Sequence, residues 1–335
     1  MLEIEKQVLN TINKYNLIEE NDKIIVAVSG GPDSMCLLDI LYSFKINNIK
    51  KYELYVAHVN HCIRIDAVED EEYVKKYCED KNLPCYIKRI DVNKLASDNK
   101  KGLEETGRKV RYTFFEELYN KLSANKIAIA HNNNDNAETV LMNIIRGTGI
   151  VGLNGIVPIR DNKYIRPIIE CDRTKIEEYC KINNIIPRID ETNKVNDYTR
   201  NKIRNICIPY IKEELNSNII NNLKRLSDIA REENEYINKI IYENYNKIKV
   251  EENDKNIVVD LKEFNKLDIF IRKKMIFYII GLLLGSPTGI SKIHIDDIIK
   301  MCEKNIGNKY LTPNKSVKIL LKNKKIFFLI NTNLP

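Results

Sequence analysis

The chain has 335 residues, 43% hydrophobic and 30% charged, so it has the composition of a globular protein and enough length for two domains. The apolar window at 275–285 is too short to span a bilayer and the N-terminus lacks a secretion-signal pattern, so we expect a cytoplasmic protein with no membrane partner. The eight cysteines include no CxxC, which argues against disulfides, and the net charge of +7 is compatible with a polyanionic partner.

Short β-branched runs alternate with amphipathic segments across the first half of the chain, a pattern typical of parallel βαβ units. The sequence therefore predicts an α/β fold with a doubly wound parallel sheet, whose ligands lie beyond the carboxyl ends of the strands. The predicted strands are residues 23–30, 54–61, 85–92, 126–132 and 164–169.

The pattern changes after residue 214. Apolar residues at three- and four-residue spacing predict one long helix over 218–245, and two further helices are expected at 269–285 and 294–305. Residues 257–261 read as a strand and 315–330 as a hairpin that turns near 322–324. We therefore expect an α/β domain at 1–214, which the resemblance described below implies to be catalytic, and a second, mostly helical domain at 215–335 that ends in the hairpin.

The segment SGGPDS lies between the first predicted strand and a helix. Such a junction exposes backbone N–H groups at a helix N-terminus, where phosphate is attracted. Gly30 and Gly31 allow close backbone approach, Pro32 fits a turn or a first helical position, and Ser29 and Ser34 add hydroxyl donors. The alternative is an ordinary strand-to-helix turn, although the six residues together favour a phosphate site. The patterns GxxxxGK[ST] and GxGxxG are both absent.

This loop resembles the SGGxDS loop of the ATP pyrophosphatases, which split ATP between its α and β phosphates. The resemblance implies that ATP is a co-substrate bound by residues 29–34, and that Asp33 helps to hold Mg2+, a hard cation suited to carboxylate oxygen. His58, near the end of the second predicted strand, is expected to line the nucleotide pocket.

Further segments resemble the tRNA(Ile)-lysidine synthetases. These segments cover about two-thirds of the chain as motifs and occur at 58–64, 104–115, 130–156, 166–168 and 190–204. The resemblance implies an ATP-dependent carbon–nitrogen ligase that adenylates the C2 oxygen of the wobble cytidine in an isoleucine tRNA with a CAU anticodon. The amine of free L-lysine then displaces AMP, and the tRNA changes specificity from methionine to isoleucine.

Two arginines in EETGRKVRY are three residues apart. Arg108 and Arg111 share a helix face and can point toward one anion, and the resemblance assigns Arg111 to the activated phosphate and Arg108 to substrate or phosphate. A solvated helix face is the alternative for Arg108.

Asp135 and Glu138 are also three residues apart, at the start of a predicted helix. Two carboxylates there can hold the lysine ammonium and help to remove its proton, although acidic residues favour helix N-termini anyway. The family commonly has HHxDDxxET, whereas Asn132 and Asn134 stand here for a histidine and an aspartate, which leaves any metal or proton-transfer role at Asn134 in doubt.

Arg200 and Arg204 lie one helical turn apart and are expected to face a substrate carboxylate, a phosphate or the base. A structural salt bridge to Asp190 or Asp197 is the competing interpretation. His58 and His61 form HxxH, but residues three apart on a strand point to opposite faces and no third ligand accompanies them, so zinc is not expected.

Three rival functions stay open: a catalytically impaired tRNA-binding paralogue, suggested by the two asparagines, a tRNA thiolase, or an amide synthetase. The lack of CxxC argues against a thiolase. Longer family members carry an extra C-terminal module that we expect this chain to lack. Candidate tRNA-phosphate contacts near the C-terminus are Lys315, Lys318, Lys322, Lys324 and Lys325.

Overall fold

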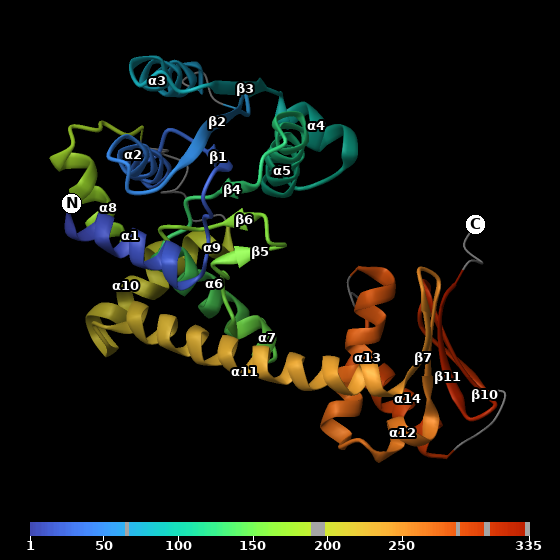
Figure 1. The fold of residues 1–335 in the computed structure, drawn as a ribbon. Helices are drawn as coiled ribbons and strands as arrows, with labels where there is room; N and C mark the ends of the chain where they lie inside the picture. The colour runs from blue at the N-terminus through green and yellow to red at the C-terminus, as the bar shows by residue number, and fades with distance from the viewer. Residues whose placement is uncertain (64–66, 189–197, 286–288, 305–308, 332–335) are drawn as a thin grey trace. The chain divides into compact units, whose positions relative to one another are not determined.

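The computed structural model describes residues 1–63, 67–188, 198–285, 289–304 and 309–331. The chain forms two compact units, Met1–Arg231 and Glu232–Pro335, and the helix α11 (Ile219–Ile248) contributes to both (Figure 1). The division falls within α11, later than the expected boundary after residue 214. The reason is that the first turns of α11 bond to the first unit, through Asn221 to Asn133 and through Ser227 to Asn136.

The first unit is built on a six-stranded sheet in the order β3-β2-β1-β4-β6-β5. All neighbouring strands are parallel except β5, which pairs antiparallel with β6, so the predicted doubly wound parallel sheet is confirmed. The strands are β1 (Asp22–Ala27), β2 (Tyr52–Asn60), β3 (Cys85–Arg89), β4 (Lys126–Ala128), β5 (Ile159–Arg160) and β6 (Tyr164–Ile165).

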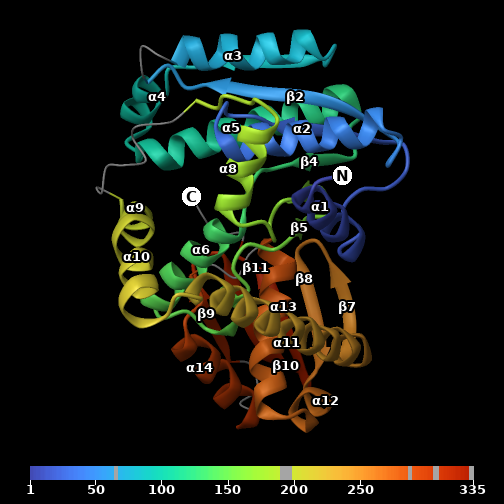
Figure 2. The same ribbon diagram turned by 90° about the vertical axis from the view of Figure 1, so that its left-hand side faces the viewer.

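Helices cover both faces of this sheet, as Figures 1 and 2 show. Because side chains alternate along a strand, Ile24 and Val26 of β1 pack with the helices of one face, while Ile25 packs on the other with Phe114 and Phe115. The face that carries Ile24 and Val26 is covered by α1 (Glu3–Lys14), α2 (Pro32–Ile46), α3 (Ala67–Asp80) and α8 (Arg173–Ile182). The face that carries Ile25 is covered by α5 (Leu103–Leu122).

The remaining elements of the first unit are short helices. They are α4 (Val92–Asn99), α6 (Asn133–Ile145), α7 (Ile150–Leu153), α9 (Thr199–Lys202) and α10 (Ile208–Tyr210), with π-helical turns η2 (Ile203–Cys207) and η3 (Ile211–Leu215). The start of α6 packs against η2 through a small apolar cluster that contains Ala137, Val140 and Ile203, and Arg200 of α9 forms ion pairs with α6. This packing brings the predicted site segments 130–138 and 200–204 together.

The second unit combines the expected helices with a five-stranded antiparallel sheet in the order β7-β8-β11-β10-β9. The predicted strand at 257–261 and the terminal hairpin are confirmed, and positive φ angles at Asn323 and Lys324 make the hairpin turn. The edge strands β7 and β9 were not expected, because β7 is mostly polar and exposed and β9 contains Pro313. The elements are β7 (Lys249–Asn253), β8 (Asn256–Asp260), α12 (Leu261–Lys266), α13 (Ile269–Leu284), α14 (Lys292–Glu303), β9 (Tyr310–Asn314), β10 (Val317–Lys322) and β11 (Lys325–Ile330).

Within the described ranges, no helix combines the length and apolar character that crossing a membrane requires.

Candidate active site

The predicted site segments meet where the strand order reverses. Strands β1 and β4 lie side by side, and their following helices α2 and α6 begin at the same edge of the sheet. In doubly wound sheets, ligands bind in the crevice that opens at this point. The loop at 29–34 and the start of α6 therefore face one another at this edge.

The loop Ser29–Ser34 is folded by its own hydroxyl groups. The Ser34 hydroxyl accepts from the Ser29 N–H at 3.1 Å and donates to the Gly31 carbonyl at 3.0 Å. Gly30 has φ +88°, a conformation that favours glycine, and Pro32 is the first residue of α2, as expected. The serine hydroxyls thus shape the loop, and the first N–H groups of α2 remain the donors suited to a phosphate.

Arg188 is a neighbour of the loop that the sequence analysis missed. Its N–H donates to the Gly30 carbonyl at 3.0 Å, and its guanidinium pairs with Asp70 at 3.0 Å and with Glu69. No local motif marks this position, because the contact joins residues that are far apart in the chain. Arg188 therefore holds the loop against α3.

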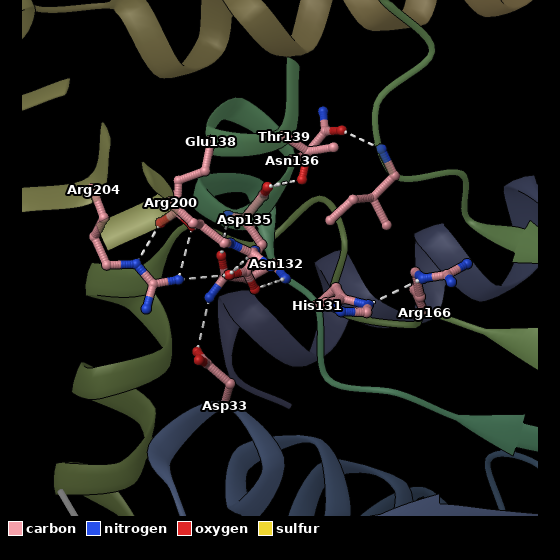
Figure 3. A network of polar contacts seen from close by, with 11 residues as sticks. Asp33, His131, Asn132, Asp135, Asn136, Glu138, Thr139, Arg166, Arg200 and Arg204 are labelled. Carbon is pink, nitrogen blue, oxygen red and sulfur yellow. Dashed lines mark hydrogen bonds and ion pairs between the residues drawn. The ribbon is translucent and has the colours of Figure 1, made fainter. Parts of the chain in front are cut away.

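Asp33, the second residue of α2, faces the start of α6. Its Oδ1 accepts a hydrogen bond of 2.9 Å from the side-chain amide of Asn132 (Figure 3). Burial and the negative charge of Asp135 raise the pKa of Asp33 to about 6. A carboxyl group with this pKa near another carboxylate is suited to hold a cation that offsets the repulsion.

The asparagines that replace the family residues at the start of α6 act as helix caps. The Asn132 side-chain oxygen accepts from the Asp135 N–H at 2.9 Å, and Asp135 in turn accepts from the Asn132 N–H at 3.1 Å. The Asn134 side-chain oxygen accepts from the backbone N–H of Arg173, which begins α8. Asn134 therefore joins two helix N-termini, and this oxygen is already used.

We expect Asn132→Ala to lower the free energy of unfolding by about 1–2 kcal/mol, because α6 loses its cap and Asp33 loses a donor. Urea denaturation of the purified variant measures this. Asn132→Asp is the matched control, since an aspartate keeps the capping oxygen but places a negative charge beside Asp33. A variant Asn132→Ala with unchanged stability would contradict the capping role.

Behind α6, Gly155 allows a close approach that no other residue permits. Its φ is +59°, and a Cβ added there would lie 2.1 Å from the side-chain oxygen of Asn136. That oxygen accepts from the Ile156 N–H at 2.8 Å, and the Asn136 amide donates to Ser227 at 3.0 Å. The loop after α7 is thereby fixed to α6 and α11.

Gly155→Ala is expected to destabilise the protein by about 2–3 kcal/mol through the clash with Asn136 and the unfavourable φ. Gly147→Ala separates these causes, because Gly147 also has a positive φ of +72° but nothing lies within 4 Å of its added Cβ. Thermal unfolding of both variants should show a clearly larger loss for Gly155→Ala. Equal losses would mean that the clash is relieved.

Asp135 and Glu138 lie together, as predicted, and both are engaged by the two arginines (Figure 3). Arg200 contacts Asp135 at 3.0 Å and Glu138 at 2.9 Å, while Arg204 contacts Asp135 at 2.9 Å and Glu138 at 2.5 Å. The Glu138 side chain is only 2% exposed. Burial opposes the charge on Arg204, but hydrogen bonds and the charges of Glu138 and Asp135 leave its pKa raised.

These four residues form a compact, electrically balanced cluster. The competing partners expected for Arg200, Asp190 and Asp197, and also Asn193, lie outside the described residues. In the structure, Arg200 and Arg204 form ion pairs with the two carboxylates predicted to bind lysine. If these carboxylates bind lysine, the arginines must share them with the lysine ammonium or release them.

Further arginines gather around His131 at the end of β4. Arg166 donates to His131 Nδ1 at 3.1 Å (Figure 3), and it also donates to the Val157 carbonyl at 2.6 Å. Burial, together with the positive charges of Arg166, Arg200, Arg108 and Arg111, lowers the pKa of His131 well below its usual value. His131 is therefore neutral at physiological pH, and the surrounding field favours an anion.

Arg111 lies on α5 with its side chain exposed, yet surrounding protein and the charge of Arg108 lower its pKa. Arg108, on the same helix face as predicted, rests on the ring of Tyr112. Their contact with a phosphate stays a prediction.

His58 supports the loop from behind. Its Nδ1 lies 2.9 Å from the Val28 carbonyl, directly before Ser29, and the residue is 3% exposed. Burial lowers its pKa, so the ring is neutral. Its Nε2 is buried without a hydrogen-bond partner among the described residues. Direct contact of His58 with ATP stays a prediction.

Within the described part of the chain, no group of three or more histidine, cysteine, aspartate or glutamate side chains is placed to hold a metal ion. A site made by the protein alone is therefore not found there. Mg2+ is commonly held by one or two carboxylates together with substrate phosphates, and the partly desolvated Asp33 at the loop fits that arrangement.

Comparison with known proteins shows the family to which the chain belongs. The family model for the PP-loop domain matches residues 1–211, which contain every site residue described above. The U34-tRNA thiolase NcsA from Methanococcus maripaludis, solved with its [4Fe-4S] cluster, has the same fold, with a TM-score of 0.55 and 18% identity over 68% of this chain and 78% of that one. The fold and the site thus define a PP-loop domain.

Curated relatives narrow the assignment. The tRNA(Ile)-lysidine synthase of Clostridium acetobutylicum is 47% identical over 309 residues, which cover 92% of this chain and 66% of the relative. That of Clostridioides difficile is 43% identical over 324 residues, covering 96% and 69%. The chain belongs to the tRNA(Ile)-lysidine synthase family. It spans about two-thirds of the length of these relatives.

Proposed function

We propose that the chain is an ATP-dependent ligase that joins free L-lysine to C2 of the wobble cytidine in an isoleucine tRNA with a CAU anticodon. The observation that carries this proposal is the meeting of the Asp33 loop with the start of α6, where Asn132 links the predicted ATP and lysine residues. Family membership supports the same reaction.

ATP binds with its β and γ phosphates on the loop, where the N–H groups at the start of α2 face the anion. Mg2+, when bound, offsets phosphate charge, and Asp33 is the residue that holds it. The role of the loop glycines is to let phosphate oxygens approach the backbone closely.

The first chemical step transfers AMP to the base. The C2 oxygen of cytidine attacks the α phosphorus, the α–β phosphate bond breaks, and pyrophosphate leaves. Arg111, exposed in a positively charged part of the surface, stabilises the charge that develops on the phosphate. The base must leave any stack to reach this position, as in other enzymes that modify bases.

In the second step, the neutral ε-amine of lysine attacks C2 and AMP leaves. Asp135 and Glu138 hold the ammonium and take up its proton. In the structure, the guanidiniums of Arg200 and Arg204 occupy that cation site. Lysine enters by taking over part of the carboxylate contacts, which frees an arginine to bind its α-carboxylate.

The second unit contributes tRNA-phosphate contacts through its exposed hairpin. Lys315, Lys322 and Lys324 are exposed, and Lys318 lies 4.2 Å from the ring centre of Tyr310. Affinity should fall as salt rises, because each phosphate contact releases counterions. A cytoplasmic location is part of the same proposal, since the tRNA and lysine are there.

The test is incubation of the full chain with ATP, radiolabelled lysine and either isoleucine or methionine tRNA with a CAU anticodon, followed by mass analysis of the nucleosides. Lysidine in the isoleucine tRNA alone supports the proposal. Tight tRNA binding without pyrophosphate release would favour the impaired paralogue. Pyrophosphate release with ammonia or a sulfur donor, and no requirement for lysine, would favour the other rivals.

A further inference from the structure

A stack of aromatic rings and guanidiniums joins α5 to β5 and β6. Apart from Arg108, which is predicted to contact substrate or phosphate, its residues lie outside the predicted site. Arg108 lies 4.7 Å from the ring centre of Tyr112, and its NH2 group donates to the Tyr112 hydroxyl at 3.2 Å. Arg160, the last residue of β5, lies 5.1 Å from the same ring centre and 4.4 Å from that of Tyr164. The two rings are 5.2 Å apart.

A shallow hollow of about 460 Å³, open to solvent, adjoins this stack. Tyr112 and Tyr164 line it, together with Lys109 and the polar residues of α5, namely Thr113, Glu116, Glu117 and Asn120. We call this feature, with the adjoining Arg108 and Arg160, the Tyr112 hollow.

The charges around the hollow leave a positive excess. Its two carboxylates are neutralised, since Glu116 pairs with Lys163 and Glu117 with Lys88. Over the part of the chain that the structure describes, neither Arg108 nor Lys109 forms an ion pair, and Arg160 pairs with the adjacent Asp161 at 3.2 Å. Aromatic faces beside unpaired cations are the chemistry that binds single-stranded nucleic acid.

The hollow is connected to the active site through Arg166. Burial lowers the pKa of Arg166 to about 10 despite its contact with Tyr112, and the charges of Arg160 and Arg108 act in the same direction. The same guanidinium donates to His131 at the end of β4. Like charges held this close repel one another, and an anion between them would relieve the repulsion.

We propose that the Tyr112 hollow binds one unpaired nucleotide of the RNA substrate, immediately next to the base that reacts. Its base stacks on the partly exposed ring of Tyr112 and on the guanidinium surfaces, and its phosphate lies against Arg108 and Arg160; Tyr164, which is 4% exposed, supports Tyr112 from below. This proposal rests on the proposed function, in which a tRNA is the molecule that receives lysine. The hollow thereby helps to pull the neighbouring base out of its stack, because one strand cannot remain stacked while its nucleotides occupy two sites.

The test uses RNA hairpins with a CAU anticodon loop, each lacking the base at one loop position, and fluorescence anisotropy with the full chain. For the wild type, removal of one base that flanks the wobble position should weaken binding about tenfold, the effect expected for a stacked base. Arg160→Ala should bind the intact hairpin about tenfold more weakly than the wild type does. For this variant, removing the base at that position should cause little further loss of affinity. Tyr112→Leu gives a second, independent variant at the hollow.

Lys121→Ala is the control, because it removes the same charge from the last turn of α5 beside Tyr86 rather than Tyr112. It should bind like the wild type, and ATP affinity should be the same in all variants. Equal penalties at every loop position, or an undiminished penalty in Arg160→Ala, would overturn the hollow as a base site, and so would a wild type that does not bind the hairpins. Position-specific binding without lysidine formation would instead contradict the proposed reaction and support the hollow.

Discussion

Replacement of Asp33 by asparagine is expected to reduce pyrophosphate release from ATP by at least about a hundredfold and, at the same time, to stabilise the ligand-free protein. The loss of activity follows because the amide carries no charge with which to hold Mg2+ at the triphosphate. The hydrogen bond from Asn132 can persist, since the new side chain keeps an acceptor oxygen. Release of pyrophosphate in the presence of tRNA measures the first effect.

The stabilisation follows from the raised pKa. Folding moves the pKa of Asp33 from its usual 3.8 to about 6, so the ionised carboxylate opposes folding once the pH rises through this window. Asparagine removes that cost, and Asp33→Asn should gain about 1–2 kcal/mol at pH 7.5, after allowance for partial exposure. Urea unfolding should show this gain shrinking to nothing below pH 4. A gain that is independent of pH would show that ionisation of Asp33 is not its cause.

Glu138→Gln is expected to make the protein unable to use lysine and to destabilise it by about 2–4 kcal/mol. The glutamine is buried between two guanidiniums and turns an N–H donor toward one of them, so Arg200 and Arg204 keep only Asp135 as a charged partner. Pyrophosphate release that depends on tRNA should persist, while incorporation of labelled lysine should fall by at least about a hundredfold.

A double-mutant cycle with Arg204→Gln separates the two effects of Glu138→Gln. If the stability loss comes from the unpaired arginine, the two substitutions should not add. The free energy of unfolding of the double variant should then be close to that of the less stable single variant. Lysine use should stay low in both variants with glutamine at 138. An unchanged requirement for lysine in Glu138→Gln would remove this residue from the lysine site and leave it as a purely structural partner of the arginines.

Local patterns predicted the parts of the fold that depend on neighbouring residues. The β-branched runs gave the five parallel strands, and the glycine-containing junction gave the loop and the start of α2 at Pro32. The strand β5 was missed because it has two residues, Ile159 and Arg160, too few to show any periodicity. Its hairpin with β6 turns through Asp161 and Asn162, both with positive φ.

The sequence predicted which charged residues belong to the candidate site, but not which of them form ion pairs with one another. The sequence separates Glu138 from Arg204 by 66 residues, and spacing along the chain cannot show which charges meet at such a separation. We expected the arginines to face a substrate, and they face the two carboxylates. The asparagines at 132 and 134 were read only as losses of charge, whereas the structure uses each amide to cap a helix.

The side-chain amide of Asn132 makes two hydrogen bonds at once. Its nitrogen donates to Asp33, and its oxygen accepts from the backbone at the start of α6. A ligand that moves Asp33 away from Asn132 leaves the Asn132 side-chain N–H without an acceptor. Because Asn132 is only 1% exposed, the loss of this hydrogen bond costs about 1–3 kcal/mol unless the start of α6 readjusts. In the proposed function, this side chain links the ATP residue Asp33 to the helix that carries the proposed lysine residues. If that proposal holds, ATP should bind before lysine, and initial-velocity patterns should be those of ordered rather than random addition.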